Sequence, residues 1–252
     1  MDPFDLRFFY DDYPRVEESV QSVIGESLPT NGPDQLYDLV TAMELPTGAR
    51  VLDVGCGDGS HTVRLGARFD VLGIDPVPAF THPGRYAVGL ASRLPVASAV
   101  ADLVWCRDVL VHEPDLDEAY AEFRRVLRPG GRALVYQMYA TPSLAPFEAS
   151  SLFAAMGVVP ANASVSRTAA AIAAAGLRVD ECLEPGSQWG EHAGEAVAGR
   201  HLMHAARLLR APALYQERLG RATYGIALGD ALWHVYRMLG KLSPRIWLLS
   251  AA

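Results

Sequence analysis

The stretch from Val51 to Gly59 constrains the fold of this chain more than any other segment. It reads Val-Leu-Asp-Val-Gly-Cys-Gly-Asp-Gly, so a short apolar run with one acid leads into three alternating glycines. The apolar run predicts a buried β-strand, and the glycines predict a tight loop directly after it. Glycine takes positive φ and has no Cβ, so the backbone of such a loop can approach a ligand closely. We therefore predict a strand end across which a nucleoside-bearing cofactor lies.

Strand-like and helix-like runs alternate from residue 50 onwards. Amphipathic helical patterns, among them Ser60–Ala67 and Leu116–Leu127, separate several short apolar runs. The expected strands are Val51–Val54, Phe69–Ile74, Tyr86–Gly89, Leu103–Cys106, Arg132–Met138, Leu177–Leu183 and Ile246–Ser250. This alternation is typical of a parallel sheet covered on both faces. We predict an α/β fold with a doubly wound, seven-stranded, mostly parallel sheet, N-terminal helices and a C-terminal helical cap insertion.

The chain divides into four expected segments. Residues 1–45 read as an aromatic, helical lid, and residues 46–185 as a Rossmann-like core that binds the cofactor. Residues 186–243 hold a long helical pattern rich in Tyr, Trp and His, and residues 244–252 supply the last strand of the core sheet. A long insertion at the ligand edge is more typical of a cap than of a separate domain. We expect this cap to bind the substrate.

Composition excludes several classes of partner. The net charge is −7 and no basic run occurs, whereas nucleic-acid phosphates require clustered Lys and Arg. The three cysteines are far apart, which argues against a disulfide framework or a zinc site. The N-terminus lacks the basic region of a signal peptide, and the longest uncharged stretch, residues 149–166, is too polar to span a bilayer. We expect a cytoplasmic monomer or homodimer without nucleic-acid or membrane partners.

The glycine loop belongs to a larger set of motifs. Gly55 and Gly57 fit the dinucleotide-binding fingerprint, but its third position is Ser60, and Asp75 closes the next strand. The other motifs are Arg93-Leu94-Pro95, Asp102-Leu103-Val104-Trp105, Asp108-Val109-Leu110-Val111-His112 and Leu127-Arg128-Pro129-Gly130-Gly131. Together they resemble the class I S-adenosylmethionine (SAM)-dependent methyltransferases of the small-molecule type. The resemblance covers roughly residues 35–140 well and the remainder in outline.

This resemblance implies SAM as the cofactor and S-adenosylhomocysteine as its product. It implies that the glycine loop passes under the methionine part, that Asp53 holds the amino group and that Asp75 holds the ribose. Leu90 departs from the family, which often has an acid at this position to bind the adenine amine. The residues that the resemblance assigns to the cofactor are Tyr13, Asp53, Gly55, Cys56, Gly57, Asp75, Pro76, Ala91, Ser92, Cys106 and Arg107.

Two histidines are the candidate catalytic bases. His112 follows the fourth expected strand, close to the methyl group by topology, although it could equally pack or cap the start of the next helix. His192 follows Trp189 and Glu191 after the sixth strand, where the chain returns to the pocket mouth or simply begins an exposed helix. Tyr139 ends the fifth strand and could face the substrate or be an ordinary aromatic residue of the rim.

Another pair of histidines has a spacing that suits a metal. His201 and His204 lie one helical turn apart, but Arg207 continues the same stripe. This stripe is more typical of a solvated helix face, so we expect no metal site.

The leading hypothesis is transfer of a methyl group from SAM to an O or N atom of a small, hydrophobic or natural-product acceptor. One alternative is a methyltransferase that acts on a peptide, and another is a non-catalytic SAM-binding partner subunit. A nicotinamide oxidoreductase is a further alternative, which Ser60 at the third glycine position disfavours.

Overall fold

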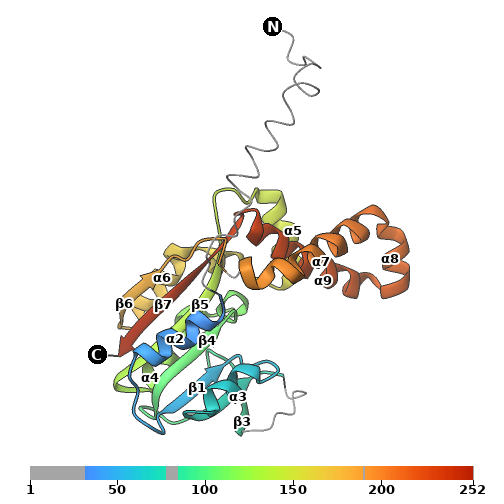
Figure 1. Ribbon diagram of the computed structural model, residues 1–252. Helices are drawn as coiled ribbons and strands as arrows, with labels where there is room; N and C mark the ends of the chain where they lie inside the picture. The colour runs from blue at the N-terminus through green and yellow to red at the C-terminus, as the bar shows by residue number, and fades with distance from the viewer. Residues whose placement is uncertain (1–31, 78–84, 190, 252) are drawn as a thin grey trace, which may run out of the picture.

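A seven-stranded sheet forms the centre of the molecule (Figure 1). The computed structural model describes residues 32–77, 85–189 and 191–251, with the side chains of residues 191–198 excepted. The strand order is β3-β2-β1-β4-β5-β7-β6, and β7 alone runs antiparallel to its neighbours. The strands are β1 Arg50–Val54, β2 Asp70–Asp75, β3 Arg85–Val88, β4 Ala101–Arg107, β5 Leu127–Ala140, β6 Leu177–Leu183 and β7 Leu242–Ala251. The predicted doubly wound, mostly parallel sheet is therefore confirmed.

Helices cover both faces of this sheet because successive strand side chains point to opposite sides. Leu52 and Val104 face a core that α4 (Leu116–Val126) and α6 (Val165–Ala174) cover. Val51 and Leu103 face a second core, against α2 (Asp34–Ala42), α3 (Ser60–Gly66) and α5 (Pro146–Met156). The apolar strand runs in the sequence thus reflect burial on two sides.

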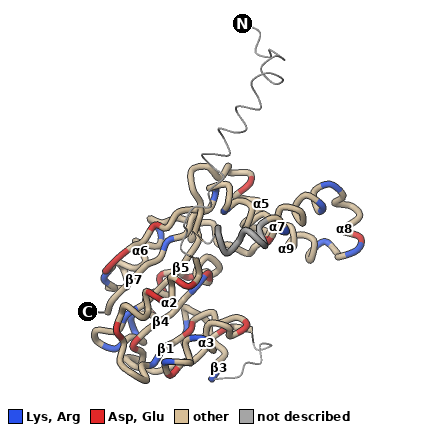
Figure 2. Tube along the Cα trace, in the orientation of Figure 1, with Lys and Arg blue, Asp and Glu red and all other residues tan. Residues whose placement is uncertain are grey.

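The expected cap consists of three helices that project from the sheet (Figure 1). These are α7 (Glu191–Arg210), α8 (Pro212–Leu219) and α9 (Arg221–Met238). Pro212 begins α8, and Gly220, with φ of 78°, separates α8 from α9. Basic and acidic residues are interspersed along the described chain, including the tip around α8 (Figure 2). None of the described helices is long and apolar enough to cross a membrane.

Three elements differ clearly from the sequence-based expectation. Strand β5 begins at Leu127, whereas the expected strand began at Arg132. Strand β7 begins at Leu242, four residues before the expected start, because it pairs with β5 from Ala140 to Arg132 along its length. Helix α5 was not expected at all. Its apolar residues do not form one stripe, since Phe147 is 74% exposed while Leu152 and Phe153 are buried.

Candidate active site

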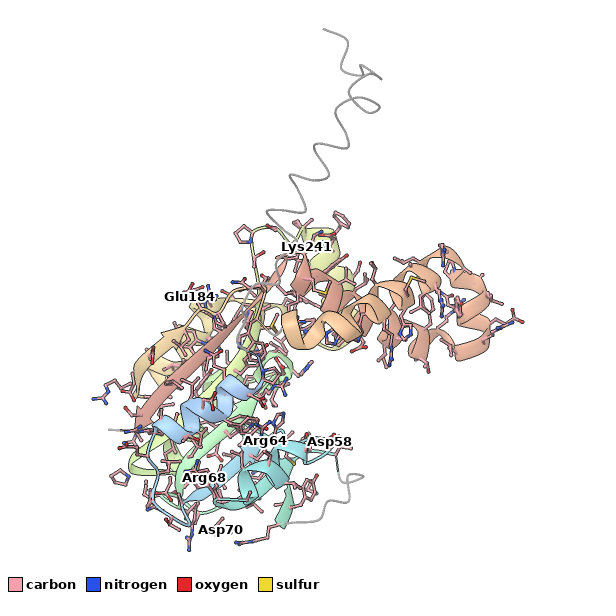
Figure 3. The ribbon with its side chains drawn as sticks, in the orientation of Figure 1. Asp58, Arg64, Arg68, Asp70, Glu184 and Lys241 are labelled. Atoms are coloured by element: carbon pink, nitrogen blue, oxygen red, sulfur yellow. The ribbon has the colours of Figure 1, made fainter. Side chains whose placement is uncertain are left out.

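The carboxyl ends of the parallel strands bring the predicted site residues to one edge of the sheet. Gly55 follows β1, Asp75 ends β2 and Arg107 ends β4. The cap reaches the same edge, since α9 leads into β7 where Leu242 pairs with Ala140. Asp58, which belongs to the glycine loop, lies on the side of the core that faces the cap, and Asp70 lies at the far end (Figure 3). Ligands of doubly wound sheets bind at this carboxyl edge.

The glycines of the loop have different physical roles. Gly55, Gly57 and Gly59 take φ of 74°, 50° and 74°, values that other residues adopt only with strain. A Cβ on Gly55 would lie 2.0 Å from Cγ2 of Val109, so the packing against Val109 itself requires glycine. A Cβ on Gly57 would have no neighbouring atom within 4 Å. Open space therefore lies beside the backbone of Gly57, as a bound ligand would require.

Asp75 connects the glycine loop to the end of β2. Its Oδ2 accepts a hydrogen bond from the Gly57 N–H at 3.0 Å, and its Oδ1 accepts one from the Val77 N–H at 2.9 Å. The residue is only 8% exposed. Each carboxylate oxygen can accept a further hydrogen bond, so Asp75 can hold the loop and still bind a pair of hydroxyls. Pro76, directly after it, is exposed.

Asp53 and the two nearby cysteines are buried beneath the loop. Oδ2 of Asp53 accepts a hydrogen bond from Thr62 Oγ1 at 2.5 Å, which ties β1 to α3. Burial, with smaller effects of Asp53 and Asp75, raises the pKa of Cys56 to about 11. Burial also raises the pKa of Cys106 well above its usual value. Both thiols therefore stay protonated at neutral pH, and they form uncharged walls instead of nucleophiles.

The segment after β3 is where the resemblance places the adenine edge. Ala91 is buried and Ser92 is half-buried. Leu90, which replaces the acid common in the family, is 49% exposed and forms a single antiparallel bridge with Arg93. An exposed apolar side chain at this place offers no hydrogen bond to an adenine amine.

A cluster around Arg107 was not predicted from the sequence. Arg107 Nη1 lies 2.6 Å from Nε2 of His61, and Nδ1 of His61 is hydrogen-bonded to the hydroxyl of Tyr37. The rings of Tyr37 and His61 pack on Trp105, with centroid distances of 5.1 and 5.6 Å. Burial, reinforced by Arg107, lowers the pKa of His61 to about 4. His61 is therefore neutral, with its proton on Nδ1, and it orients Arg107.

Asp108 also lies at this edge of the sheet, directly after Arg107. It begins the motif Asp108-Val109-Leu110-Val111-His112, but no role was predicted for it from the sequence. It takes φ of 57°, and its Oδ1 is buried without a hydrogen-bond partner while the side chain as a whole is 42% exposed. Burial raises the pKa of Asp108 to about 6, against the opposing effects of Arg107 and Arg237. Strained and unsatisfied groups concentrate at functional sites, so Asp108 joins the candidate site.

His112 lies in a short 3-10 helix, η2 (Leu110–His112), that buried polar contacts hold in place. Asn162, in η3 (Pro160–Ala163), donates to the carbonyls of Leu110 and Glu113 at 2.9 and 2.7 Å. Nδ1 of His112 lies 3.1 Å from the carbonyl oxygen of Gly157. The ring itself is exposed. His112 is thus both anchored, as the packing interpretation expects, and accessible, as a base must be.

Two predicted site residues cannot be placed. Tyr13 lies outside the described residues, and His192 belongs to α7 but its side chain is not described. Trp189, just before α7, is buried; its Nε1 donates to Gln35 at 2.7 Å, and its ring lies 4.8 Å from that of Tyr136.

Residues 52–135 match the profile of a protein family described as a methyltransferase domain. Phosphoethanolamine N-methyltransferase 3 of Arabidopsis thaliana is 29% identical over 136 residues, which cover 48% of this chain and 28% of that protein. The 27-O-demethylrifamycin SV methyltransferase of Amycolatopsis mediterranei is 31% identical over 128 residues, which cover 45% of this chain and 47% of that protein. This chain contains a class I SAM-dependent methyltransferase domain.

Solved structures share the fold of the methyltransferase domain and its cap. The structure of the cyclase SpnF has a TM-score of 0.65 and 20% sequence identity, and the match covers 95% of this chain and 93% of that one. Such an identity shows the fold alone. The chain spans less than half the length of the two curated methyltransferases above, so the likeness to them concerns the domain and not the whole protein.

Proposed function

We propose that the chain transfers a methyl group from SAM to an O or N atom of a small, hydrophobic acceptor of the natural-product type. The observation that carries the proposal is the glycine loop, whose Gly57 N–H is bound by the Asp75 carboxylate at the carboxyl edge of the sheet. SAM supplies an activated methyl group on a sulfonium, and S-adenosylhomocysteine is the product. The protein has to align the acceptor and exclude water.

The residues at this edge fit SAM. Open space lies beside Gly57, and Asp75 retains acceptor capacity for the ribose hydroxyls. Arg107 has a buried Nε without a hydrogen-bond partner, which lies 3.8 Å from Oδ2 of Asp108, and we propose that the guanidinium also attracts the carboxylate of the methionine part. We propose the remaining predicted residues, Asp53 and Ala91 among them, as the other walls of the site.

His112 suits the role of general base. The Gly157 carbonyl oxygen can only accept, so Nδ1 of His112 carries a proton and Nε2 of the neutral ring keeps its lone pair. A hydrogen bond at one ring nitrogen that leaves the other free to take a proton is how catalytic histidines are oriented. This supports an acceptor that loses a proton, such as a hydroxyl or an ammonium group.

Two observations support the proposal of a small, hydrophobic acceptor: the position of the cap and the activities named for the relatives. The rings of Trp189 and Tyr136 pack together in the core where the cap meets β5, so the cap is anchored beside the carboxyl edge of the sheet. The relatives include a phosphoethanolamine N-methyltransferase and a 27-O-demethylrifamycin SV methyltransferase. We therefore propose residues 186–243 as the acceptor-binding cap.

Replacement of Asp75 tests the cofactor site. We expect Asp75→Ala to weaken SAM binding by about 1–3 kcal/mol, or roughly 5- to 150-fold, because charge-assisted hydrogen bonds are lost. Titration calorimetry with SAM and S-adenosylhomocysteine measures this. Asp70→Ala is the matched control, since Asp70 begins the same strand and its carboxylate pairs with Arg85 at the surface. Equal affinity of the Asp75 variant and the wild type would remove the ribose assignment.

Replacement of His112 tests the base. We expect His112→Ala to lower kcat by about 100-fold or more, with SAM affinity changed by less than about threefold. The assay follows a labelled methyl group from SAM into a panel of hydrophobic phenols and amines. His204→Ala, which removes an exposed imidazole of the cap, is the control. Full turnover by the His112 variant would restrict this residue to packing.

A SAM-binding protein that does not transfer the methyl group is the second candidate. The structure named as the cyclase SpnF shows that this fold also occurs in a protein that is not named as a methyltransferase. Calorimetry would detect SAM binding in both cases. Turnover with any member of the acceptor panel selects the methyltransferase, and incorporation into peptides alone selects the peptide alternative.

A further inference from the structure

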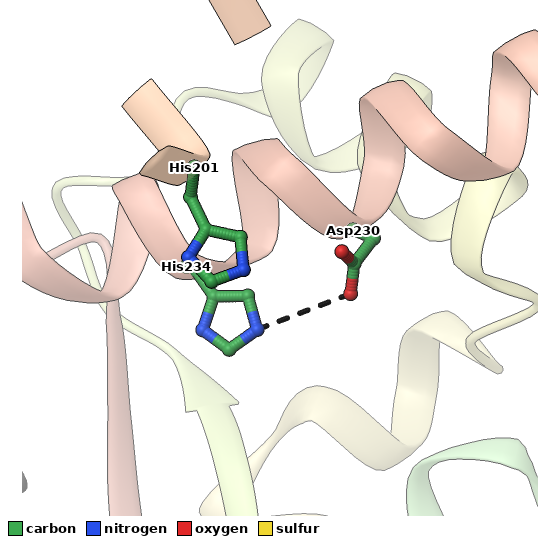
Figure 4. Close-up of side chains that lie close together, drawn as sticks. All are labelled: His201, Asp230 and His234. Atoms are coloured by element: carbon green, nitrogen blue, oxygen red, sulfur yellow. Dashed lines mark ion pairs between the residues drawn. The ribbon is translucent and has the colours of Figure 1, made fainter. Parts of the chain in front are cut away.

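Three potential metal ligands from two neighbouring cap helices come close together (Figure 4). His201 belongs to α7, whereas Asp230 and His234 belong to α9. One ligand atom from each of the three residues lies within 4.8 Å of those of the other two. The two imidazole rings are stacked with a centroid distance of 4.0 Å, and Nε2 of His234 lies 3.9 Å from Oδ1 of Asp230.

Helix geometry and helix packing produce this cluster together. Asp230 and His234 are four residues apart, so they lie one above the other on a single face of α9. The packing of α7 against α9 then adds the ring of His201 from outside that helix. The basic residue one turn further along α9, Arg237, donates a hydrogen bond to the Trp189 carbonyl at 2.5 Å. This contact engages one nitrogen of the guanidinium, and the Arg237 charge still reaches His234, whose pKa is lowered by burial, by His201 and by Arg237.

We propose that His201, Asp230 and His234 bind one divalent transition-metal ion, and that Zn²⁺ fits this donor set best. Two imidazole nitrogens and one carboxylate oxygen are ligands that zinc accepts, whereas Mg²⁺ and Ca²⁺ require oxygen ligands. Zn–N bonds of about 2.0–2.1 Å in a tetrahedron place ligand atoms about 3.3 Å apart. All three side chains are at least partly exposed, so they can close this distance by rotation.

The ion would connect α7 to α9 and hold the cap in one arrangement. Three protein ligands leave the fourth tetrahedral position for a water molecule or for an oxygen of another ligand. The site lies on the cap and shares no residue with the proposed SAM site. Its existence therefore does not depend on the proposed methyl transfer.

Titration of the whole, untagged chain tests the site. After treatment with a chelator, calorimetry with ZnCl₂ should show one ion per chain, and Co²⁺ should give the visible absorption of a tetrahedral complex. We expect His201→Ala and His234→Ala each to weaken zinc binding at least tenfold. His204→Ala is the matched control, because His204 lies on α7 three residues after His201 and outside the cluster. Zinc affinity equal to that of the wild type in both variants would overturn the proposal.

Thermal unfolding separates loss of the metal from loss of the fold. Without metal, the conservative variant Asp230→Asn should unfold at the temperature of the wild type. Addition of Zn²⁺ should raise the unfolding temperature of the wild type and of His204→Ala, but not that of His201→Ala. An equal rise in all of these proteins would mean that zinc binds elsewhere, and this result would also overturn the proposal.

Discussion

His61 is held as a neutral ring between a phenol and a guanidinium. Arg107 donates to Nε2, so Nδ1 keeps the proton and bonds to Tyr37. Protonation of Nε2 would remove the acceptor of Arg107 and place two cations in contact. The residue thus positions Arg107 at the end of β4, next to the methyl-transfer site that we propose.

This ring should make the stability of the protein depend on pH. Its pKa is about 4 in the folded chain and about 6.5 when unfolded, so the unfolded chain binds the extra proton between these values. The contribution of His61 to the free energy of unfolding should therefore be fully present above about pH 6.5 and should be lost as the pH falls toward 4. The loss is on the order of 2 kcal/mol once partial solvent exposure is allowed for.

Urea unfolding at pH 7 and pH 4.5 measures this effect. His61→Gln cannot titrate, so we expect it to lose less stability between the two pH values than the wild type does. His204→Gln replaces an exposed histidine and should parallel the wild type. An identical loss in the wild type and His61→Gln would show that His61 is protonated equally in both states.

At the scale of the element, contacts with Ile74, Asp75 and Val109 fix the glycine loop in place. The backbone N–H groups of Gly55 and Cys56 donate to the Ile74 carbonyl at 2.7 and 3.1 Å. The N–H of Gly57 donates to the Asp75 carboxylate. Gly55 also packs on the side chain of Val109. The loop is thereby connected to β2 and to the segment that carries His112. These contacts within the protein fix the shape of the loop.

Alanine substitutions should separate packing from binding within this loop. Gly55→Ala should cost about 2–4 kcal/mol of stability, because its Cβ overlaps Val109 and its φ is positive. Gly57→Ala should cost only about 1–2 kcal/mol, for its backbone conformation, but should weaken SAM binding at least tenfold. Urea unfolding and calorimetry measure the two effects.

A double variant provides the control for this pair. Val109→Ala in the Gly55→Ala background should recover part of the lost stability, since the overlapping methyl groups are removed. The same change should not rescue SAM affinity in Gly57→Ala. If Gly57→Ala binds SAM like the wild type, the open space beside Gly57 is not part of the cofactor site.

At the scale of the whole molecule, Trp189 joins the cap to the core of the sheet domain. Its indole N–H bonds to Gln35 on α2, its ring packs on Tyr136 of β5, and its carbonyl accepts from Arg237 on α9. One buried residue therefore connects three elements that are distant in the sequence, two of them through its side chain and α9 through its backbone carbonyl.

Truncation of this side chain should loosen the cap. We expect Trp189→Ala to cost about 3–5 kcal/mol and to speed proteolysis within α7–α9 before the core is cut. Trp189→Phe keeps most of the packing and should cost about 1–2 kcal/mol for the lost hydrogen bond. Phe147→Ala, on an exposed aromatic residue of α5, is the control. If the protease cuts the cap and the core of Trp189→Ala at equal rates, Trp189 does not hold the cap in place.

Local patterns predicted much of this protein. The strands, the glycine loop and Asp75 at the end of β2 follow from apolar runs, turn residues and the topology of parallel sheets. Tyr139 shows where such reasoning ends: its hydroxyl bonds to Thr168 and Trp247 in the core, and it does not lie on the rim. The side to which a strand-end residue points depends on neighbours that local periodicity does not contain.

The amino-acid sequence by itself determined the sheet and the edge at which its parallel strands end, because short-range periodicity and turn chemistry encode them. The family came from the resemblance of the quoted motifs to class I methyltransferases. Only the tertiary structure decided which side chains meet. His201 pairs with His234 of another helix instead of its helical neighbour His204, and His61 bridges Tyr37 and Arg107. These contacts depend on how helices pack across the sheet and within the cap, and that packing is a property of the whole chain.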